Sequence, residues 1–197
     1  GNSILSGLTI TNGFKPGIYV SSGATPNISK CYIWSVEYGC FLDGDATIDS
    51  CEIASAHSGI ICYYGSTSPT ITNSLISSCN YGIYYYKPAW IDSCTIKNSK
   101  YGILVIIGSN NGTDGHISNC LIEDNWYQGI RIYSLTYDDL YINNNTIRDN
   151  DYVGTSTNYG IYYSNGGGTV YVKNNLIYGN DDYGIYSSAD DPIEIWD

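Results

Sequence analysis

Two short patterns of apolar and polar residues alternate along the whole chain. The first is Gly-Ile, or once Gly-Cys, with successive glycines from 20 residues (Gly39 to Gly59) to 31 residues (Gly129 to Gly160) apart. The second is apolar-x-x-Cys/Asn/Ser-x-Ile, which recurs at residues 28–33, 48–53, 71–76, 91–96, 117–122 and 142–147, with variants at 5–10 and 172–177. Both patterns are too short for helices, and Gly, Asn, Asp and Ser separate them. They therefore predict short strands joined by turns.

No single repeat can bury its own apolar side chains. Repeats stacked about 4.8 Å apart share backbone hydrogen bonds and one continuous core. The sequence thus predicts an all-β fold, a single-stranded right-handed parallel β-helix (a solenoid) of about eight coils. Leucine-rich repeats have a similar period, but their leucine signature is missing. We expect residues 1–197 to form a single β-helix domain, a segment of a larger protein with uncapped ends.

The central residue of the second pattern forms a column that we expect to point inward with the flanking isoleucines. Its members are Leu8, Cys31, Cys51, Ser74, Cys94, Cys120, Asn145 and Asn175. Small thiols fill a tight interior, and the Asn amides can bond to one another up the stack. Seven cysteines cannot all pair, and side chains that point the same way do not suit a disulfide. The sequence therefore predicts free thiols, and the absence of a CxxC pair disfavours zinc.

Two residues after each glycine lies a column that should point outward. Its members are Tyr19, Phe41, Ile61, Tyr84, Leu104, Arg131, Tyr162 and Tyr186, and a neighbouring column adds Tyr63, Tyr86, Ile106 and Tyr133. Exposed aromatic surface marks an interaction site, and Tyr rings can stack on sugar faces. The eight aromatic residues Tyr19, Phe41, Tyr63, Tyr84, Tyr86, Tyr133, Tyr162 and Tyr186 are therefore candidate ligand-binding residues. The alternatives are that loops or a neighbouring domain cover this face, or that the rings stack only for stability.

Candidate chemistry lies where the repeat is interrupted, at 106–115, 133–140 and 150–158. Arg131 breaks the aromatic column, and we expect Asp138 and Asp139, with Asp114 and His116, to lie within about one coil of it. An Arg base beside carboxylates would suit β-elimination from a uronate polymer. Arg131, Asp138 and Asp139 are therefore candidate catalytic residues. The alternative is a surface ion pair.

A second acidic group recurs just after the second pattern. Its members are Asp124, Asp149, Asp151, Asp181 and Asp182, together with Asn125, Asn150 and Asn180. Oxygen ligands at this density could hold Ca²⁺, the one cofactor that the sequence suggests. The alternative is that turns select Asp and Asn for their local hydrogen bonds.

Net charge and hydropathy limit the classes of partner that this chain can be expected to bind. The net charge of −11 argues against nucleic acid and anionic membranes, and against bare contact with polyuronates unless a cation inverts the local field. No apolar stretch is long enough to insert into a membrane. Phosphate-binding loops, HExxH and GxSxG are absent from the sequence.

Residues 4–196 resemble the right-handed parallel β-helix repeat family of the carbohydrate-binding and sugar-hydrolase type, a pectate-lyase-like solenoid. The resemblance rests on 7–13 (GLTITNG), 144–147 (NNTI) and 183–186 (YGIY). It implies kinship with pectate lyases, polygalacturonases, alginate epimerases, tailspike-like proteins and noncatalytic surface modules. Polygalacturonase motifs such as Gly-His-Gly and Arg-Ile-Lys are missing, and Asp191-Pro192 is followed by Ile193 rather than by an epimerase motif.

These observations predict a noncatalytic extracellular or cell-surface β-helix module that binds polysaccharide or forms part of a surface assembly. The alternative is a polysaccharide lyase or glycoside hydrolase that uses Arg131. The expected partners are a polysaccharide or neighbouring domains of the parent protein. Neither nucleic acid nor membrane insertion is expected.

Overall fold

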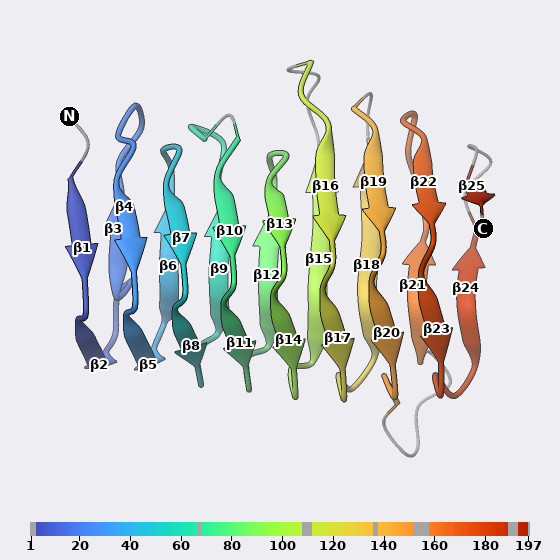
Figure 1. Ribbon diagram of the computed structural model, residues 1–197, viewed down its shortest axis with the longest axis horizontal. Helices are drawn as coiled ribbons and strands as arrows, with labels where there is room; N and C mark the ends of the chain where they lie inside the picture. Colours follow the sequence, from blue (N-terminus) through green and yellow to red (C-terminus); the bar gives the residue numbers. More distant parts are fainter. Residues whose placement is uncertain are drawn as a thin grey trace.

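The computed structural model describes residues 3–66, 68–107, 112–135, 138–151, 158–188 and 193–196. All regular structure in this part of the chain is β-strand, and the strands form three parallel sheets that coil into a solenoid of about eight turns. Figure 1 shows the coils side by side along the long axis, with the first and last coils at opposite ends. The predicted fold class is confirmed. The described part of the chain holds no helix long and apolar enough to span a bilayer.

Each coil contributes one strand to each sheet in turn. Sheet A consists of β1 (Ile4–Ser6), β4 (Asn27–Ser29), β7 (Thr47–Asp49), β10 (Thr70–Thr72), β13 (Trp90–Asp92), β16 (Gly115–Ser118), β19 (Leu140–Asn143), β22 (Val170–Lys173) and β25 (Ile193–Trp196). Sheet B consists of β2 (Thr9–Gly13), β5 (Tyr32–Val36), β8 (Glu52–Ala54), β11 (Leu75–Ser77), β14 (Thr95–Lys97), β17 (Leu121–Glu123), β20 (Thr146–Arg148) and β23 (Leu176–Tyr178). Sheet C consists of β3 (Ile18–Val20), β6 (Tyr38–Leu42), β9 (Ser58–Cys62), β12 (Tyr81–Tyr85), β15 (Tyr101–Ile107), β18 (Gln128–Leu135), β21 (Tyr159–Tyr163) and β24 (Tyr183–Ser187).

The core is built from aliphatic residues that lie above one another in consecutive coils. Ile48, Ile71 and Ile91 are in register in sheet A, and all three are fully buried. The glycine of the Gly-Ile pattern is required by the close approach of the next coil. A Cβ atom on Gly82 would lie only 2.5 Å from the carbonyl oxygen of Gly102. The spacing between coils thus excludes a side chain at this position.

The corners between sheets A and B and between sheets B and C share one construction. A residue with positive φ, such as Ser50, Asn98 or Asp149, ends the strand, and an inward-pointing small or polar residue follows it. Asn, Asp and Ser at the left-handed positions fit this turn, because short polar side chains tolerate that conformation. This geometry explains why polar residues punctuate the repeat so regularly.

The inward polar residues at these corners form hydrogen-bonded ladders. Asn145 Nδ2 donates to Asn175 Oδ1 at 2.9 Å, while the backbone N–H of Cys120 donates to Asn145 Oδ1 at 2.9 Å. The predicted amide column is therefore confirmed, although Leu8 at its start is 39% exposed. All seven cysteines are free and buried, as predicted. Burial raises the pKa of the Cys51 and Cys79 thiols to about 11, which keeps them protonated at neutral pH.

Candidate functional site

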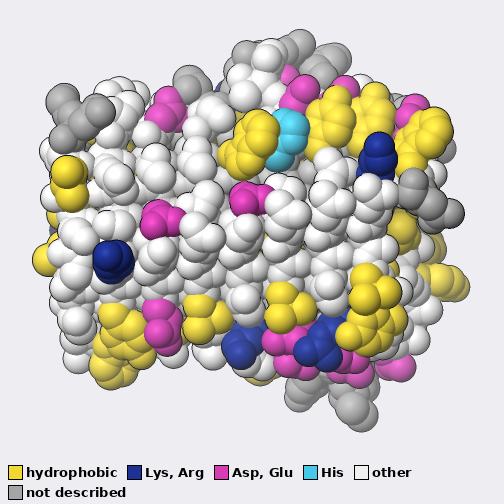
Figure 2. Space-filling model, in the orientation of Figure 1, with side chains coloured by type: hydrophobic (Ala, Val, Ile, Leu, Met, Phe, Trp, Pro, Cys, Tyr) yellow, Lys and Arg dark blue, Asp and Glu magenta, His cyan; other side chains and the backbone are white. Residues whose placement is uncertain are grey.

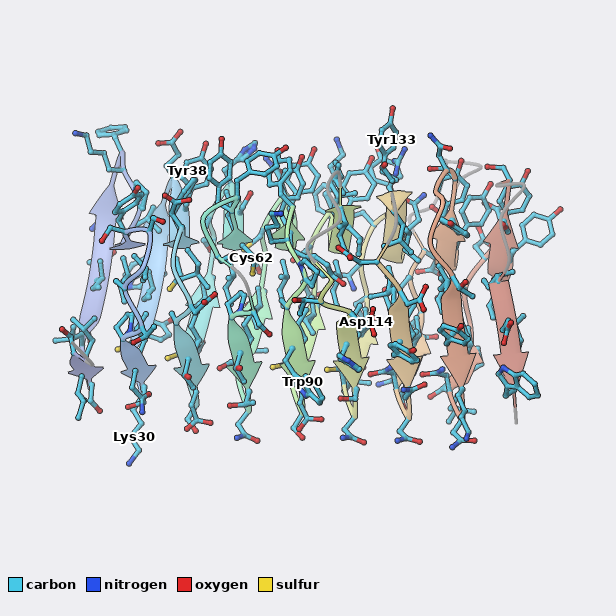
Figure 3. The ribbon with its side chains drawn as sticks, turned by 90° about the horizontal axis from the view of Figure 1, so that it is seen from above. Lys30, Tyr38, Cys62, Trp90, Asp114 and Tyr133 are labelled. Carbon is cyan, nitrogen blue, oxygen red and sulfur yellow. The ribbon has the colours of Figure 1, made fainter. Side chains whose placement is uncertain are left out.

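The outward face of sheet C presents the predicted aromatic column in register. Tyr19, Phe41, Ile61, Tyr84, Leu104, Arg131, Tyr162 and Tyr186 are partners in consecutive coils. Strand alternation turns these side chains outward, because the preceding isoleucine of each Gly-Ile pattern faces the core. Figure 3 shows Tyr38 and Tyr133 on the side of the solenoid opposite Trp90 and Lys30. We call this surface of sheet C, together with the neighbouring rings described below, the aromatic face.

The second predicted column keeps its register from Tyr63 through Tyr86 to Ile106, and only Tyr133 departs from it. The Tyr63 and Tyr86 rings pack with centroids 5.6 Å apart. In β15 and β18, however, the register shifts after Val105, so that Ile106 pairs with Ser134 rather than with Tyr133. An extra residue in one strand of a parallel pair causes this bulge, which the simple repeat does not reveal. Tyr133 is 53% exposed beside it.

A hollow of about 290 Å³ opens on the aromatic face over Ile61, and we call it the Ile61 hollow. Its walls are Tyr38, Phe41, His57, Ser58, Tyr63, Tyr84 and Tyr86. The rings of this wall are tilted against one another, with Phe41 and Tyr63 at 47° and Tyr63 and Tyr86 at 84°. Ile61 interrupts the aromatic column, and the Tyr63 and Tyr86 rings link Phe41 to Tyr84 around it, so that only 5% of Ile61 is exposed. The hollow therefore presents ring faces above an aliphatic floor.

A second hollow, of about 240 Å³, opens over Leu104, and we call it the Leu104 hollow. It is lined by Tyr81, Tyr84, Tyr101, Leu104, Ile106, Arg131 and Tyr133. Tyr84 lines both hollows, and its hydroxyl accepts a hydrogen bond of 2.7 Å from the Tyr86 hydroxyl. Burial, followed by that hydrogen bond, raises the pKa of Tyr84, so its phenol stays neutral. A neutral phenol between two hollows can serve either of them as a hydrogen-bond partner.

Arg131 lies among rings rather than among carboxylates. Its guanidinium carbon is 5.4 Å, 5.6 Å and 5.5 Å from the ring centroids of Tyr101, Tyr133 and Tyr162. Nη1 is 3.4 Å from the Tyr101 hydroxyl, and Nε is buried without a hydrogen-bond partner. Cation–π contacts with several aromatic residues hold the guanidinium in place. Arg131 is therefore a fixed positive charge at the wall of the Leu104 hollow.

Asp138 and Asp139, predicted to act with Arg131, lie in the connection from β18 to β19. Asp138 is 4% exposed, and its Oδ1 accepts a hydrogen bond of 3.2 Å from the backbone N–H of Gly112. Asp139 Oδ1 accepts one of 2.9 Å from the backbone N–H of Thr169. Among the described residues, no hydrogen bond or ion pair joins either carboxylate to Arg131. The catalytic role of the three residues stays a prediction that this geometry does not favour.

Sequence comparison gives the family of this fold. A family model described as a right-handed β-helix region matches the chain in two overlapping stretches, residues 1–113 and 43–195. The chain belongs to the right-handed β-helix family. The family predicted from the repeat is thus confirmed for nearly the whole length of this β-helix. Searches among curated proteins and among solved structures found no match.

The acidic residues predicted to bind calcium line the corner between sheets B and C of the β-helix. Asp124 and Asp149 occupy positive-φ positions there, and Asp149 pairs with Arg148 at 2.8 Å. Asp182 accepts a hydrogen bond from the backbone N–H of Asn158, while Asp151 and Asp181 are exposed. Within the described ranges, no group of three or more His, Cys, Asp or Glu residues could hold a metal ion.

The prediction that the asparagines of this group help to hold Ca²⁺ is wrong. Asn125 and Asn150 are fully buried, and Asn125 Nδ2 donates to Asn150 Oδ1 at 2.8 Å. Asn150 Nδ2 donates in turn to Asn180 Oδ1 at 3.0 Å. These amides form a second inward ladder and do not face a ligand. The density of oxygen atoms in the sequence reflects corner geometry here, because each inward polar group needs a buried partner.

A second aromatic surface on sheet A was not predicted. Trp90, His116, Tyr141 and Tyr171 occupy one outward column of consecutive coils, with successive ring centroids 4.1 Å, 5.0 Å and 4.8 Å apart. Figure 2 shows a row of hydrophobic side chains interrupted by a histidine on this side of the molecule. We call these four residues the sheet A ladder. The position just before each sheet A isoleucine or valine could have revealed it. His116 thus stacks here and does not join Arg131, which lies on sheet C.

Proposed function

We propose that this β-helix is a noncatalytic extracellular or cell-surface module that binds polysaccharide along the aromatic face. The main support is the pair of ring-walled hollows that share Tyr84. Aromatic faces stack on the C–H faces of sugars, and phenol hydroxyls bond to sugar hydroxyls. Two hollows that follow one another along the stack of coils suit an extended polymer better than a small molecule.

The linings of the two hollows favour binding over catalysis. Glycoside hydrolysis uses a pair of carboxylates on either side of the scissile bond. Neither hollow has an Asp or Glu among its lining residues. In the Ile61 hollow, His57 Nδ1 is 3.1 Å from Asn80 Nδ2, so one of its two ring nitrogens is hydrogen-bonded. The net charge of −11 also favours a glycan over nucleic acid as the partner.

Affinity electrophoresis with neutral and acidic polysaccharides would test this proposal. Tyr84→Ala should weaken binding roughly thirtyfold, because removal of a central ring at an interface costs about 2 kcal/mol. Tyr141→Ala removes the same side chain from sheet A and should leave the affinity unchanged. Equal affinities for the Tyr84→Ala variant and the parent would contradict the proposed site.

Light scattering on the same mixtures would test the noncatalytic part of the proposal. Polymer chains incubated with the protein should keep their size, with and without calcium. If the parent protein shortens the polymer chains and the Arg131→Ala variant leaves them intact, the protein is instead a lyase or hydrolase.

A further inference from the structure

The two hollows have similar aromatic walls but different charges. Arg131 is the only Lys, Arg, Asp or Glu in the lining of the Leu104 hollow, and the Ile61 hollow has none in its lining. An arginine side chain stays protonated at any physiological pH, so the positive charge of the Leu104 hollow is permanent. The same polymer would thus meet a positive site at one hollow and, at the other, a lining without Lys, Arg, Asp or Glu.

Arg131 has no counter-ion among the described residues. The ion pairs found there are those of Arg148 with Glu123 and Asp149, at a sheet B corner. The Nε atom of Arg131 is buried without a partner, although guanidinium donors are normally satisfied when buried. A partly buried cation without a paired anion is costly. A ligand that brings its own anion would remove that cost.

Carboxylates at the aromatic face lie at other coils. Glu37 directly precedes Tyr38, a wall residue of the Ile61 hollow, and it is exposed at the corner where β5 ends. Burial, followed by the charge of Glu37, raises the pKa of Tyr38. Burial, followed by the charge of Asp182, raises the pKa of Tyr159 near the C-terminal end of the face. A second carboxylate in the Ile61 hollow would therefore meet repulsion from Glu37. Lys100 Nζ, 5.9 Å from the Tyr101 ring centroid, adds a second cation beside the Leu104 hollow, so the local charges favour an anion there.

The spacing of the coils sets the distance between the two hollows. Ile61 pairs with Tyr84, and Tyr84 pairs with Leu104, so the hollow floors lie two coils apart. Two coil rises amount to about 10 Å. This distance corresponds to about two sugar units of an extended glycan, with the intervening unit over Tyr84. The two hollows would then hold sugars that are not adjacent in the polymer.

We propose that Arg131 makes the aromatic face selective for heteropolysaccharides in which a uronate is followed, about two units away, by a neutral sugar. This inference rests on the proposed function. The planar carboxylate of the uronate binds the guanidinium fork at the Leu104 hollow, and the neutral sugar occupies the Ile61 hollow. A homopolymer of uronates fits less well, since it places a carboxylate near Glu37. The overall negative charge therefore does not exclude acidic glycans, because Arg131 supplies the local cation.

Paired probes would test the inference. Deacylated gellan has one glucuronate in each linear repeat, and reduction of its carboxyl groups gives a neutral polymer with the same linkages. The protein should bind deacylated gellan about tenfold more tightly than its carboxyl-reduced form, as expected for one charge-assisted contact. Arg131→Gln should bind both forms equally, at the affinity for reduced gellan. Lys173→Gln removes one positive charge from sheet A and should keep the tenfold preference.

Two further variants sharpen the assignment. Arg131→Lys keeps the charge without the planar fork and should keep only part of the preference. Because this result does not depend on the glutamine variant, the inference stays testable even if Arg131→Gln misfolds. Glu37→Gln should strengthen binding of polygalacturonate, in which every sugar carries a carboxylate. Equal binding of deacylated and carboxyl-reduced gellan by the parent, or a preference for the unreduced polymer that persists in Arg131→Gln, would overturn the charge selectivity alone. No binding of any form would overturn the proposed function as well.

Discussion

The solenoid has two outward aromatic surfaces, and they are built differently. In the sheet A ladder the rings follow one another without interruption, and the His116–Tyr141 and Tyr141–Tyr171 pairs are nearly parallel at 10° and 9°. On the aromatic face, Ile61, Leu104 and Arg131 interrupt the column, and the rings around the Ile61 hollow are tilted by up to 84°. The ladder thus covers its ring faces along its whole length. The aromatic face also has stacked pairs, such as Tyr81–Tyr101 at 9° and Tyr162–Tyr186 at 11°, but it leaves ring faces open around the two hollows.

This difference shows that aromatic content alone does not make a binding surface on a β-helix. An unbroken column of rings at the coil spacing of about 4.8 Å satisfies its own stacking, and it contributes to stability. A column broken by smaller side chains leaves gaps with ring walls. The aliphatic positions at Ile61 and Leu104 are therefore as important for the proposed site as the tyrosines.

The strongest test converts the aromatic face into a second ladder. Ile61→Tyr combined with Leu104→Tyr would complete the aromatic column from Tyr19 to Leu104 and fill both hollows. We expect polysaccharide affinity to fall by at least thirtyfold, because the floors of both binding sites are lost. Calorimetric titration against the parent would measure this loss. The melting temperature should stay close to that of the parent, because both side chains point outward into the hollows. An unchanged melting temperature separates a filled site from an unfolded protein.

Single variants provide the control for that experiment. Ile61→Leu and Leu104→Ile keep the side-chain volume and should bind like the parent. Undiminished affinity in the double tyrosine variant would mean that the glycan does not enter the hollows. The proposed site would then have to move elsewhere on the solenoid.

The fold and the main aromatic column could be predicted because they repeat. The glycine represented by Gly82 and the inward isoleucines recur at a fixed place in every coil, so a single sequence contains eight examples of the same constraint. The β-bulge after Val105 occurs once among the described strands, and no repetition reveals it. The roles of Asn125 and Asn150 were missed for another reason. An amide at a corner can face solvent or the core, and only the stacked coils decide between them.

The relation of Arg131 to its neighbours could not be predicted from spacing. Asp138 follows it closely in sequence, but sheet C ends between them and the chain turns toward sheet A. Two of the three rings around the guanidinium come from β15 and β21, in the coils before and after, and the third is Tyr133 of β18 itself. Residues separated by a whole coil are thus closer than residues on the same loop. Sequence distance is a poor guide to a site on a solenoid for this reason.

The second test weakens the sheet A ladder. Tyr141→Ala removes stacking on both His116 and Tyr171, which should lower the free energy of unfolding by about 1–2 kcal/mol. A drop of this size corresponds to roughly 2–8 °C in melting temperature for a chain of this length. Differential scanning calorimetry would measure it, with Tyr133→Ala, an exposed ring on the aromatic face, as the control. A larger loss for Tyr133→Ala than for Tyr141→Ala would contradict the division between a stabilising and a binding surface.

The smallest expected effect is a pH dependence of the sheet A ladder. Burial lowers the pKa of His116 below its ordinary value, and the charge of Asp114 opposes this only in part. The folded state therefore favours the neutral imidazole. The contribution of the neutral imidazole to the free energy of unfolding is complete above the ordinary value of about 6.5 and is lost as the pH falls through that value toward the lower folded pKa.

His116→Phe keeps a ring between Trp90 and Tyr141 but cannot be protonated, and it retains His57. Between about pH 8 and pH 5 the parent should lose a degree or so more in melting temperature than this variant. Parallel curves would show that the stack tolerates the imidazolium, as cation–π contacts with Trp90 and Tyr141 would allow.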